Sequence, residues 1–332
     1  MKSISFIKPF EAHWGAPGGV VQTIVGSQLR GKSLLSPPRI RHELHLNDQG
    51  RAIIYEIEPQ NETLPIVLLA HGMGGCSESV YMKRISNKLW MRGYGVILIN
   101  QSGCGPGMGL SPRMWHGGSS DDLEKMIDFV VQRYPEKSLA PVGFSLSGNV
   151  LLKYLGEGRK VPKNISGALA VNPPVDLRVA SDIISRKWSC ALFNKYYMRL
   201  IRNQAVALVK QFPSAFNPLK NLKTIWDFDV SYTAPAGGFK DVDDYYDRSS
   251  SKHFLEEIKT PTSILSAKDD PFVPGYLFDQ IAMNEKVTLH KPDNGGHMGY
   301  ISRRATPHGD RLWMDYAVLE WIRELHESEG NP

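Results

Sequence analysis

The chain has few cysteines and no long apolar run. Its 332 residues include only Cys76, Cys104 and Cys190, which are far apart and lack the short spacing of a metal-binding or redox pair. Such cysteines predict free thiols and a reducing, cytoplasmic setting. No stretch of about eighteen apolar residues occurs, and Pro9 interrupts the N-terminal segment. The sequence therefore predicts no signal peptide, no membrane span and no stable membrane anchor.

A strong charge of either sign is also missing. The formal net charge is +5, and Lys and Arg are interspersed with Asp and Glu, without a basic run. This pattern argues against a nucleic-acid or membrane-surface partner. The ten histidines show no ligand spacing, so no metal site is expected. The composition, 42% hydrophobic and 22% charged, is ordinary for a globular protein with a large core.

Strand and helix patterns alternate along most of the chain. A β-hairpin is predicted for residues 40–58, with its turn at residues 47–50. Buried strands are predicted at 64–72, 95–100, 139–144, 165–172, 262–267 and 286–291, and helices at 79–92, 119–134, 145–155 and 311–327. This order predicts an α/β fold, residues 1–332 forming one domain with a mainly parallel central sheet flanked by helices.

The alternation stops between residues 173 and 257. This segment is rich in aromatic and basic residues and has helical patches such as YYMRLIRNQAVALVKQF. We interpret it as a helical cap inserted over the sheet.

The stretch GFSLSGN, residues 143–149, approaches the G-x-S-x-G motif of a nucleophilic serine on a strand-to-helix turn. Ser145 occupies the nucleophile position, and Ser147 stands in place of the second glycine. Asp270 follows the predicted strand 262–267, and His297 follows the strand 286–291. A serine, an acid and a histidine in this order, each at the end of a strand, predict a nucleophile, an orienting carboxylate and a general base.

Such a serine also needs donors for the oxyanion that forms during acyl transfer. We expect one from the backbone N–H of Leu146 and the other from Met73, in the loop HGMGG after an early strand. His71, at the end of that strand, is expected to hold the loop rather than act as a base. For His116 a structural role and an approach to the site both remain open. Ser147 is expected to be tolerated as the smallest polar substitute for glycine.

With these residues identified, the chain resembles the YheT-like branch of the α/β-hydrolase superfamily, esterases related to the mammalian abhydrolase-domain phospholipases. The resemblance covers nearly the whole length and rests on HGMGGCSES, NQSGCG, HGGSSDDL, GFSLSGNVLLKYLGE, NPPVDL, GFKDVDDYYDRSS, AKDDPFVP and NGGHMGY. The family's catalytic triad falls on Ser145, Asp270 and His297. The family usually has glycine where Ser147 stands, and commonly arginine where Ser102 stands.

The resemblance implies hydrolysis of small-molecule carboxylic esters, acyl or lipid-like, without a cofactor. An acyltransferase with the same triad, or a catalytically silent ligand-binding member of the fold, is the alternative. Aromatic residues of the cap, Trp188, Phe193, Tyr196 and Tyr197, are candidates for binding the acyl group, although core packing would explain them equally well. The oligomeric state is not predicted.

Overall fold

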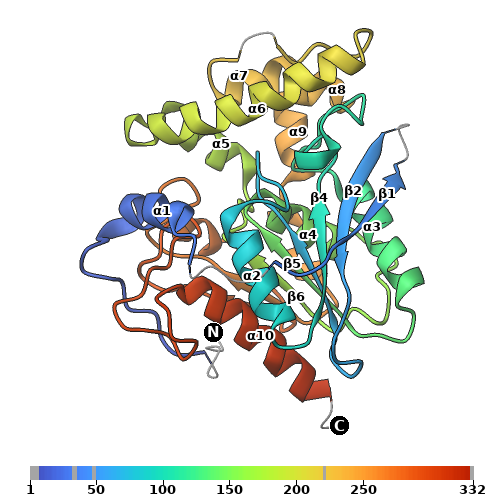
Figure 1. Cartoon of the computed structure of the whole chain (residues 1–332). Helices are drawn as coiled ribbons and strands as arrows, with labels where there is room; N and C mark the ends of the chain where they lie inside the picture. The colour runs from blue at the N-terminus through green and yellow to red at the C-terminus, as the bar shows by residue number, and fades with distance from the viewer. Residues whose placement is uncertain (1–6, 32–35, 47–49, 220–221, 330–332) are drawn as a thin grey trace.

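A computed structural model describes residues 7–31, 36–46, 50–219 and 222–329 of the chain. Within them one sheet of eight strands has the order β1-β2-β4-β3-β5-β6-β7-β8 (Figure 1). The strands are β1 Ile40–His45, β2 Arg51–Ile57, β3 Ile66–Ala70, β4 Gly95–Asn100, β5 Leu139–Phe144, β6 Ala168–Val171, β7 Thr262–Leu265 and β8 Val287–His290. β2 runs antiparallel to β1 and β4, and the other neighbours are parallel. The predicted mainly parallel sheet is confirmed.

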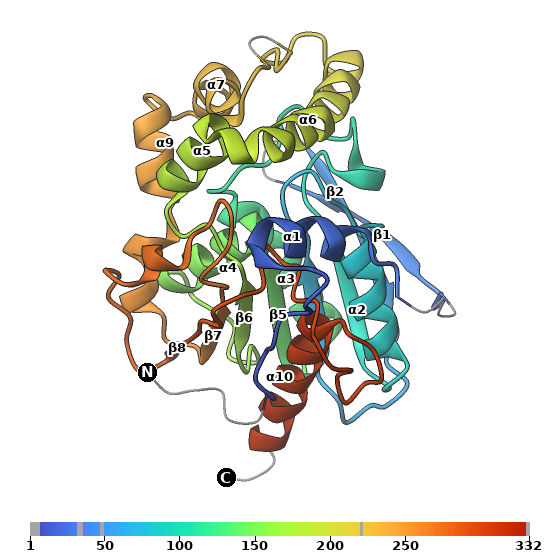
Figure 2. The same cartoon turned by 90° about the vertical axis from the view of Figure 1, so that its left-hand side faces the viewer.

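The central strands are apolar because helices cover both faces of the sheet. β3, β4 and β5 are buried along their entire lengths. The helices α3 (Ser120–Arg133) and α4 (Leu146–Gly156) pack on one face. On the other face lie α2 (Val80–Trp90) and α10 (Trp313–Glu329), seen in front of the sheet in Figure 2.

Most predicted elements are present with their ends shifted by a few residues. The helices predicted at 79–92, 119–134, 145–155 and 311–327 are α2, α3, α4 and α10, whose ends differ by one or two residues. The predicted hairpin is β1 and β2, but residues 47–49 of its turn lie outside the described residues.

The helix α1 (Gly18–Gln28) was not expected from the sequence. Glycine is a poor helix former, and this helix contains Gly18, Gly19 and Gly26. Two of these glycines lie where α1 touches the loops after β7 and β8. A Cβ on Gly19 would lie 1.7 Å from the Asp269 carbonyl oxygen, and one on Gly26 would lie 2.5 Å from Gly299. The close contacts with these two loops therefore require glycine at both positions, and the same glycines weaken the helical pattern in the sequence.

The described part of residues 173–257 is helical and contains no strand. Its helices are α5 (Leu177–Arg186), α6 (Ala191–Gln211), α7 (Ile225–Phe228), α8 (Ala234–Ala236) and α9 (Val242–Ser249), and a π-helix spans Asp229–Thr233. Figure 1 shows these helices stacked above one end of the sheet. We call this helical segment the cap, and its bounds as a separate unit remain a prediction.

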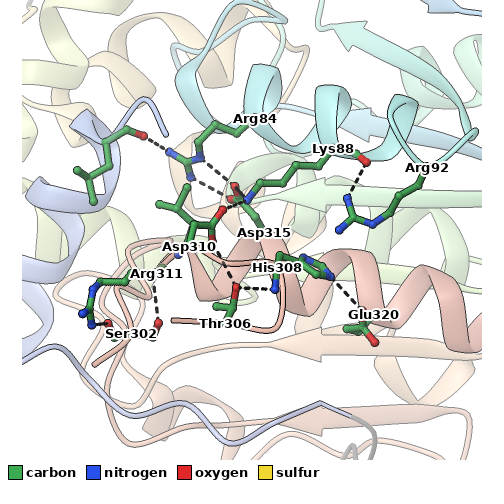
Figure 3. Close-up of polar contacts among 12 residues, drawn as sticks. Arg84, Lys88, Arg92, Ser302, Thr306, His308, Asp310, Arg311, Asp315 and Glu320 are labelled. Carbon is green, nitrogen blue, oxygen red and sulfur yellow. Dashed lines mark hydrogen bonds and ion pairs between the residues drawn. The ribbon is translucent and has the colours of Figure 1, made fainter. Parts of the chain in front are cut away.

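A cluster of buried ion pairs joins α2 to α10 (Figure 3). Arg84 donates from Nε and Nη2 to the carboxylate of Asp315, both at 3.0 Å. Lys88 Nζ donates to Asp315 at 2.8 Å and to Asp310 at 2.7 Å. Arg84 also donates to the carbonyl oxygen of Leu29, just after α1. The charges thus connect three helices on the face of the sheet seen in Figure 2.

Candidate active site

Ser145 lies on a tight turn between β5 and α4. Its backbone has φ 51° and ψ −120°, a conformation that is strained for a residue with a side chain. The turn is possible because its neighbours are small. A Cβ on Gly143 would lie 2.6 Å from the Ser147 carbonyl oxygen, and one on Gly72 would lie 3.1 Å from Ser145 Cβ. The G-x-S motif therefore folds as a strained elbow that presents the Ser145 side chain.

The three predicted catalytic residues, Ser145, His297 and Asp270, are connected by consecutive hydrogen bonds. Ser145 Oγ is 2.8 Å from His297 Nε2, and His297 Nδ1 is 2.7 Å from Asp270 Oδ2. Asp270 and His297 are both buried. With Nδ1–H donating to the carboxylate, Nε2 is free to accept the Ser145 proton. This geometry can activate a serine nucleophile.

Asp270 is held by four hydrogen bonds. Its Oδ1 accepts from the backbone N–H groups of Phe272 at 3.1 Å and Val273 at 2.9 Å. Its Oδ2 accepts from His297 and, at 2.8 Å, from Asn172 Nδ2. Asn172 follows β6 with φ 47°, and its Oδ1 accepts from the buried hydroxyl of Tyr300 at 3.0 Å. The carboxylate is therefore fixed in the orientation that a histidine requires.

The loop carrying His297 is fixed by α1 from the N-terminal part of the chain. The His297 backbone N–H donates to Thr23 Oγ1 at 2.8 Å, and the Gly296 N–H donates to Asp269 Oδ1, also at 2.8 Å. The ring of Phe272 lies against the imidazole, with 4.2 Å between ring centroids. Backbone and side chain of His297 are thus both restrained.

The two predicted oxyanion donors flank Ser145. Leu146 is the first residue of α4, where the backbone N–H has no partner inside the helix. Met73 lies in the loop after β3, and both residues line the same pocket as Ser145. In the described part of the chain neither N–H donates a hydrogen bond to another protein group. Both N–H groups are therefore available as donors, and their role in binding an oxyanion remains a proposal.

A buried polar network supports the loop that carries Met73. Ser147 Oγ donates to the His71 carbonyl oxygen at 2.5 Å and accepts from Gln101 Nε2 at 3.0 Å. His71 Nε2 accepts from the Gln101 backbone N–H, and its Nδ1 donates to the Gly72 carbonyl oxygen. Burial lowers the pKa of His71 to about 4, so the ring is neutral. As predicted, His71 holds the loop. Ser147 fits the elbow because its hydroxyl has two partners.

A largely apolar pocket extends from Ser145 into the cap. It contains about 840 Å³ of space, counting the part open to solvent. Among its walls are Leu146, Leu177, Ile201 and Phe272. His116 also lines the pocket. Burial and, to a lesser extent, nearby positive charges lower the pKa of His116 to about 3, so its side chain is neutral. The pocket can accept an acyl or alkyl group beside the nucleophile.

Only one of the four aromatic residues expected to bind the acyl group lines this pocket. Tyr197 does so, whereas Phe193 packs in the cap core against Phe272. Trp188 and Tyr196 are 88% and 55% exposed, so the expectation is wrong for these two. Aromatic residues gather along much of the cap sequence, and their type alone did not indicate which face of each helix turns inward.

Sequence reasoning missed three residues that support the triad. Thr23 and Asn172 are short polar side chains in segments where nothing in the local pattern marks them. Phe272 stands in the quoted stretch AKDDPFVP, but its contact with His297 depends on the meeting of two loops. A possible signal for Asn172 was its position directly after a buried strand, where polar side chains at a sheet edge gather.

The described residues give no support for a metal site, a reactive Cys104 or a membrane-spanning helix. They include no group of three or more His, Cys, Asp or Glu side chains arranged to hold a metal ion. Burial raises the pKa of the Cys104 thiol, and its Sγ accepts from Gln204 in the core. Across the same residues, each helix is too short or too polar to cross a membrane.

Comparison with known proteins places this geometry in context. Residues 65–303 match the family model described as alpha/beta hydrolase fold. A solved structure of a 2,6-dihydroxy-pseudo-oxynicotine hydrolase superposes with a TM-score of 0.59 at 19% identity, covering 89% of this chain and 70% of that one. At 19% sequence identity, this similarity is evidence for a shared fold alone.

Relatives similar in sequence match most of the chain, including one from Saccharomyces cerevisiae and one from Escherichia coli. A monoacylglycerol lipase of Saccharomyces cerevisiae is 28% identical over 278 residues, 80% of this chain. The chain spans only 61% of that lipase's length. The YheT protein of Escherichia coli K12 is 25% identical over 316 residues, 93% of this chain and 92% of its own.

Proposed function

The chain belongs to the α/β-hydrolase fold family, and from this premise we propose that it is a serine hydrolase that cleaves carboxylic esters. One observation carries the proposal. Ser145 Oγ, the His297 imidazole and the Asp270 carboxylate are joined by hydrogen bonds of 2.8 and 2.7 Å, and Ser145 lines an apolar pocket. The names of the relatives, a monoacylglycerol lipase among them, support an acyl or lipid-like ester as substrate.

In the proposed reaction Ser145 Oγ attacks the ester carbonyl carbon while His297 Nε2 takes the hydroxyl proton. The N–H groups of Met73 and Leu146 bind the oxyanion of the tetrahedral intermediate. The C–O bond to the alcohol then breaks, and His297 returns its proton to the leaving alkoxide. Water, deprotonated by His297, attacks the acyl-enzyme, the bond between the acyl carbon and Ser145 Oγ breaks, and His297 returns the proton to Oγ as the acid is released. Asp270 stabilises the imidazolium at each stage.

Labelling with a fluorophosphonate tests this proposal. We expect one adduct per chain by intact mass, mapped to Ser145 by peptide sequencing, and no adduct on Ser145→Ala. Ser27→Ala, at an exposed serine of α1, is the matched control and should label like the parent. An unlabelled parent protein would count against the enzyme and favour a silent ligand-binding member of the fold.

A second assay separates hydrolysis from acyl transfer. With an activated ester in water plus a competing alcohol, we expect the free acid as the main product. A new ester as the main product would instead identify an acyltransferase.

We also propose a cytoplasmic location. All three cysteines are free, which suits a reducing compartment.

A further inference from the structure

A polar cluster interrupts the apolar wall of the pocket on the side of the cap. Asp229 begins the π-helix Asp229–Thr233, and its carboxylate accepts from Thr233 Oγ1 at 2.7 Å and from Tyr246 Oη at 2.9 Å. Ser181 Oγ of α5 lies 2.8 Å from Tyr246 Oη. All four residues line the pocket that contains Ser145. We call them the Asp229 cluster.

Within the part of the chain that the structure describes, no positive charge balances this carboxylate. Among the described residues, Asp229 forms no ion pair with the protein, and no Lys or Arg lines the pocket. Burial raises the pKa of Asp229 to about 6, which leaves the group mostly ionised at pH 7 and above. A carboxylate can accept about four hydrogen bonds, and the hydroxyls of Thr233, Tyr246 and Ser181 supply three of them. The cluster is therefore an anionic site with acceptor capacity left.

Aromatic rings line the same pocket. Phe228 precedes Asp229, and Tyr245 and Tyr246 lie with their ring centroids 5.1 Å apart. All three line the pocket. Aromatic faces attract cations, and more strongly where water is excluded. A neutral amide could link α5 to α9 without the cost of a buried charge, so structure alone does not account for a carboxylate.

We propose that the Asp229 cluster binds an alkylammonium group of the substrate, with esters that carry phosphate or carboxylate groups disfavoured in this pocket. The cation would supply the missing countercharge, and the surrounding rings would bind its alkyl substituents. This inference rests on the proposed ester hydrolysis at Ser145 and adds to it the chemical class of the substrate.

Two pairs of esters of equal shape test the inference. In one pair the acyl chain of a p-nitrophenyl ester ends in trimethylammonium or in tert-butyl. In the other pair the alcohol is choline or 3,3-dimethylbutanol. We expect the parent protein to favour the cationic member of at least one pair roughly tenfold or more in kcat/KM. In Asp229→Asn the ratio should fall to about one, with the neutral ester still cleaved.

Asp227→Asn is the matched control, since Asp227 lies on α7, in the same cap but outside the pocket lining. It should keep the preference for the cation. No preference in either pair for the parent, or a preference that survives in Asp229→Asn, would overturn the inference. The inference would also be overturned if an ester with a hydroxyl group in place of the trimethylammonium group had a higher kcat/KM than the cationic ester.

The pH dependence in the parent protein gives a test that needs no variant. The ratio between cationic and neutral esters should decline as the pH falls below about 6, where Asp229 becomes protonated. The groups facing this carboxylate are Ser181 of α5, Thr233 of its own helix, and Tyr245 and Tyr246 of α9. None of them ionises between pH 5 and 8, because burial raises the pKa of both tyrosines. Taking the ratio cancels the titration of the triad, and a ratio independent of pH would contradict the inference.

Failure of this inference can be told apart from failure of the proposed function. Cleavage of the neutral esters with a Ser145 adduct, but without cation preference, rejects only the Asp229 cluster. If no ester is cleaved, calorimetric titration of Ser145→Ala with hexyltrimethylammonium ion examines the cluster by itself. We expect binding that is lost when Asp229→Asn is added, and unchanged binding would reject the site.

Discussion

At the scale of single residues, Ser147 shows how a departure from a common motif is accommodated. The position is buried, and a side chain there needs partners for its polar atom. The hydroxyl finds them in the His71 carbonyl oxygen and the Gln101 amide, so it reinforces the loop that carries Met73. A glycine would leave both groups without this partner.

Ser147→Gly is therefore expected not to raise activity. It should lower kcat/KM for a p-nitrophenyl ester by up to about tenfold and the free energy of unfolding by about 1–3 kcal/mol, the usual cost of unpaired buried polar groups. Steady-state kinetics and urea unfolding measure the two effects. Ser147→Ala separates loss of the hydroxyl from the added backbone freedom of glycine. A gain of orders of magnitude in activity would show that Ser147 impairs the elbow.

At the scale of elements, α1 completes the active site from 274 residues away in sequence. Thr23 Oγ1 accepts from the His297 N–H, and the same hydroxyl donates to the Gly19 carbonyl oxygen at 2.6 Å. The helix and the loop approach closely because Gly19 and Gly296 have no side chains. A Cβ on Gly296 would lie 2.2 Å from the Gly19 carbonyl oxygen. α1 is thus a positioning element for His297.

Thr23→Val should remove this support while keeping the shape of the side chain. We expect kcat to fall roughly ten- to a hundredfold with little change in KM, because small displacements of a catalytic base are costly. Thr23→Ser restores the hydroxyl and should recover most of the activity. Equal kcat values for the valine and serine variants would show that Thr23 does not position His297.

At the scale of the whole molecule, the ion pairs of Arg84 and Lys88 in Figure 3 join α2 to Asp310 and Asp315, which lie 222 to 231 positions further along the chain. Asp315 is fully buried between Arg84 and Lys88. Burial alone would raise the pKa of Asp315, but the two positive charges outweigh it, and the pKa is lowered. A carboxyl whose pKa is lower in the folded than in the unfolded state stabilises the fold above its unfolded pKa of about 3.9. That contribution is lost as the pH falls through the folded value.

Asp315→Asn should accordingly destabilise the protein by about 3–5 kcal/mol at pH 7, because Arg84 and Lys88 lose a buried partner. The difference from the parent should narrow as the pH drops below about 4. Urea unfolding at a series of pH values measures both effects. Asp243→Asn, which removes an exposed ion pair with Arg178, should cost at most about 1 kcal/mol. A loss for Asp315→Asn no larger than for this control would contradict the argument.

The α/β architecture could be predicted from the sequence alone, as could the order of Ser145, Asp270 and His297 at the ends of strands. Both are local properties, since apolar runs predict buried strands and each of the three residues follows such a run. Leu146 and Met73 were located by the same reasoning, as the residue after the serine and a residue in the loop after a strand.

Which distant side chains support these residues depends on how the chain folds in three dimensions. Thr23, Asn172 and Asp229 reach the site through contacts between segments about 100 or more residues apart, or through the folding of the cap over the sheet. Packing of the cap also decides which of its aromatic residues face the pocket: Tyr197 lines it, whereas Trp188 is exposed. Local patterns record the period of a helix or strand, whereas such contacts depend on how the elements pack against one another.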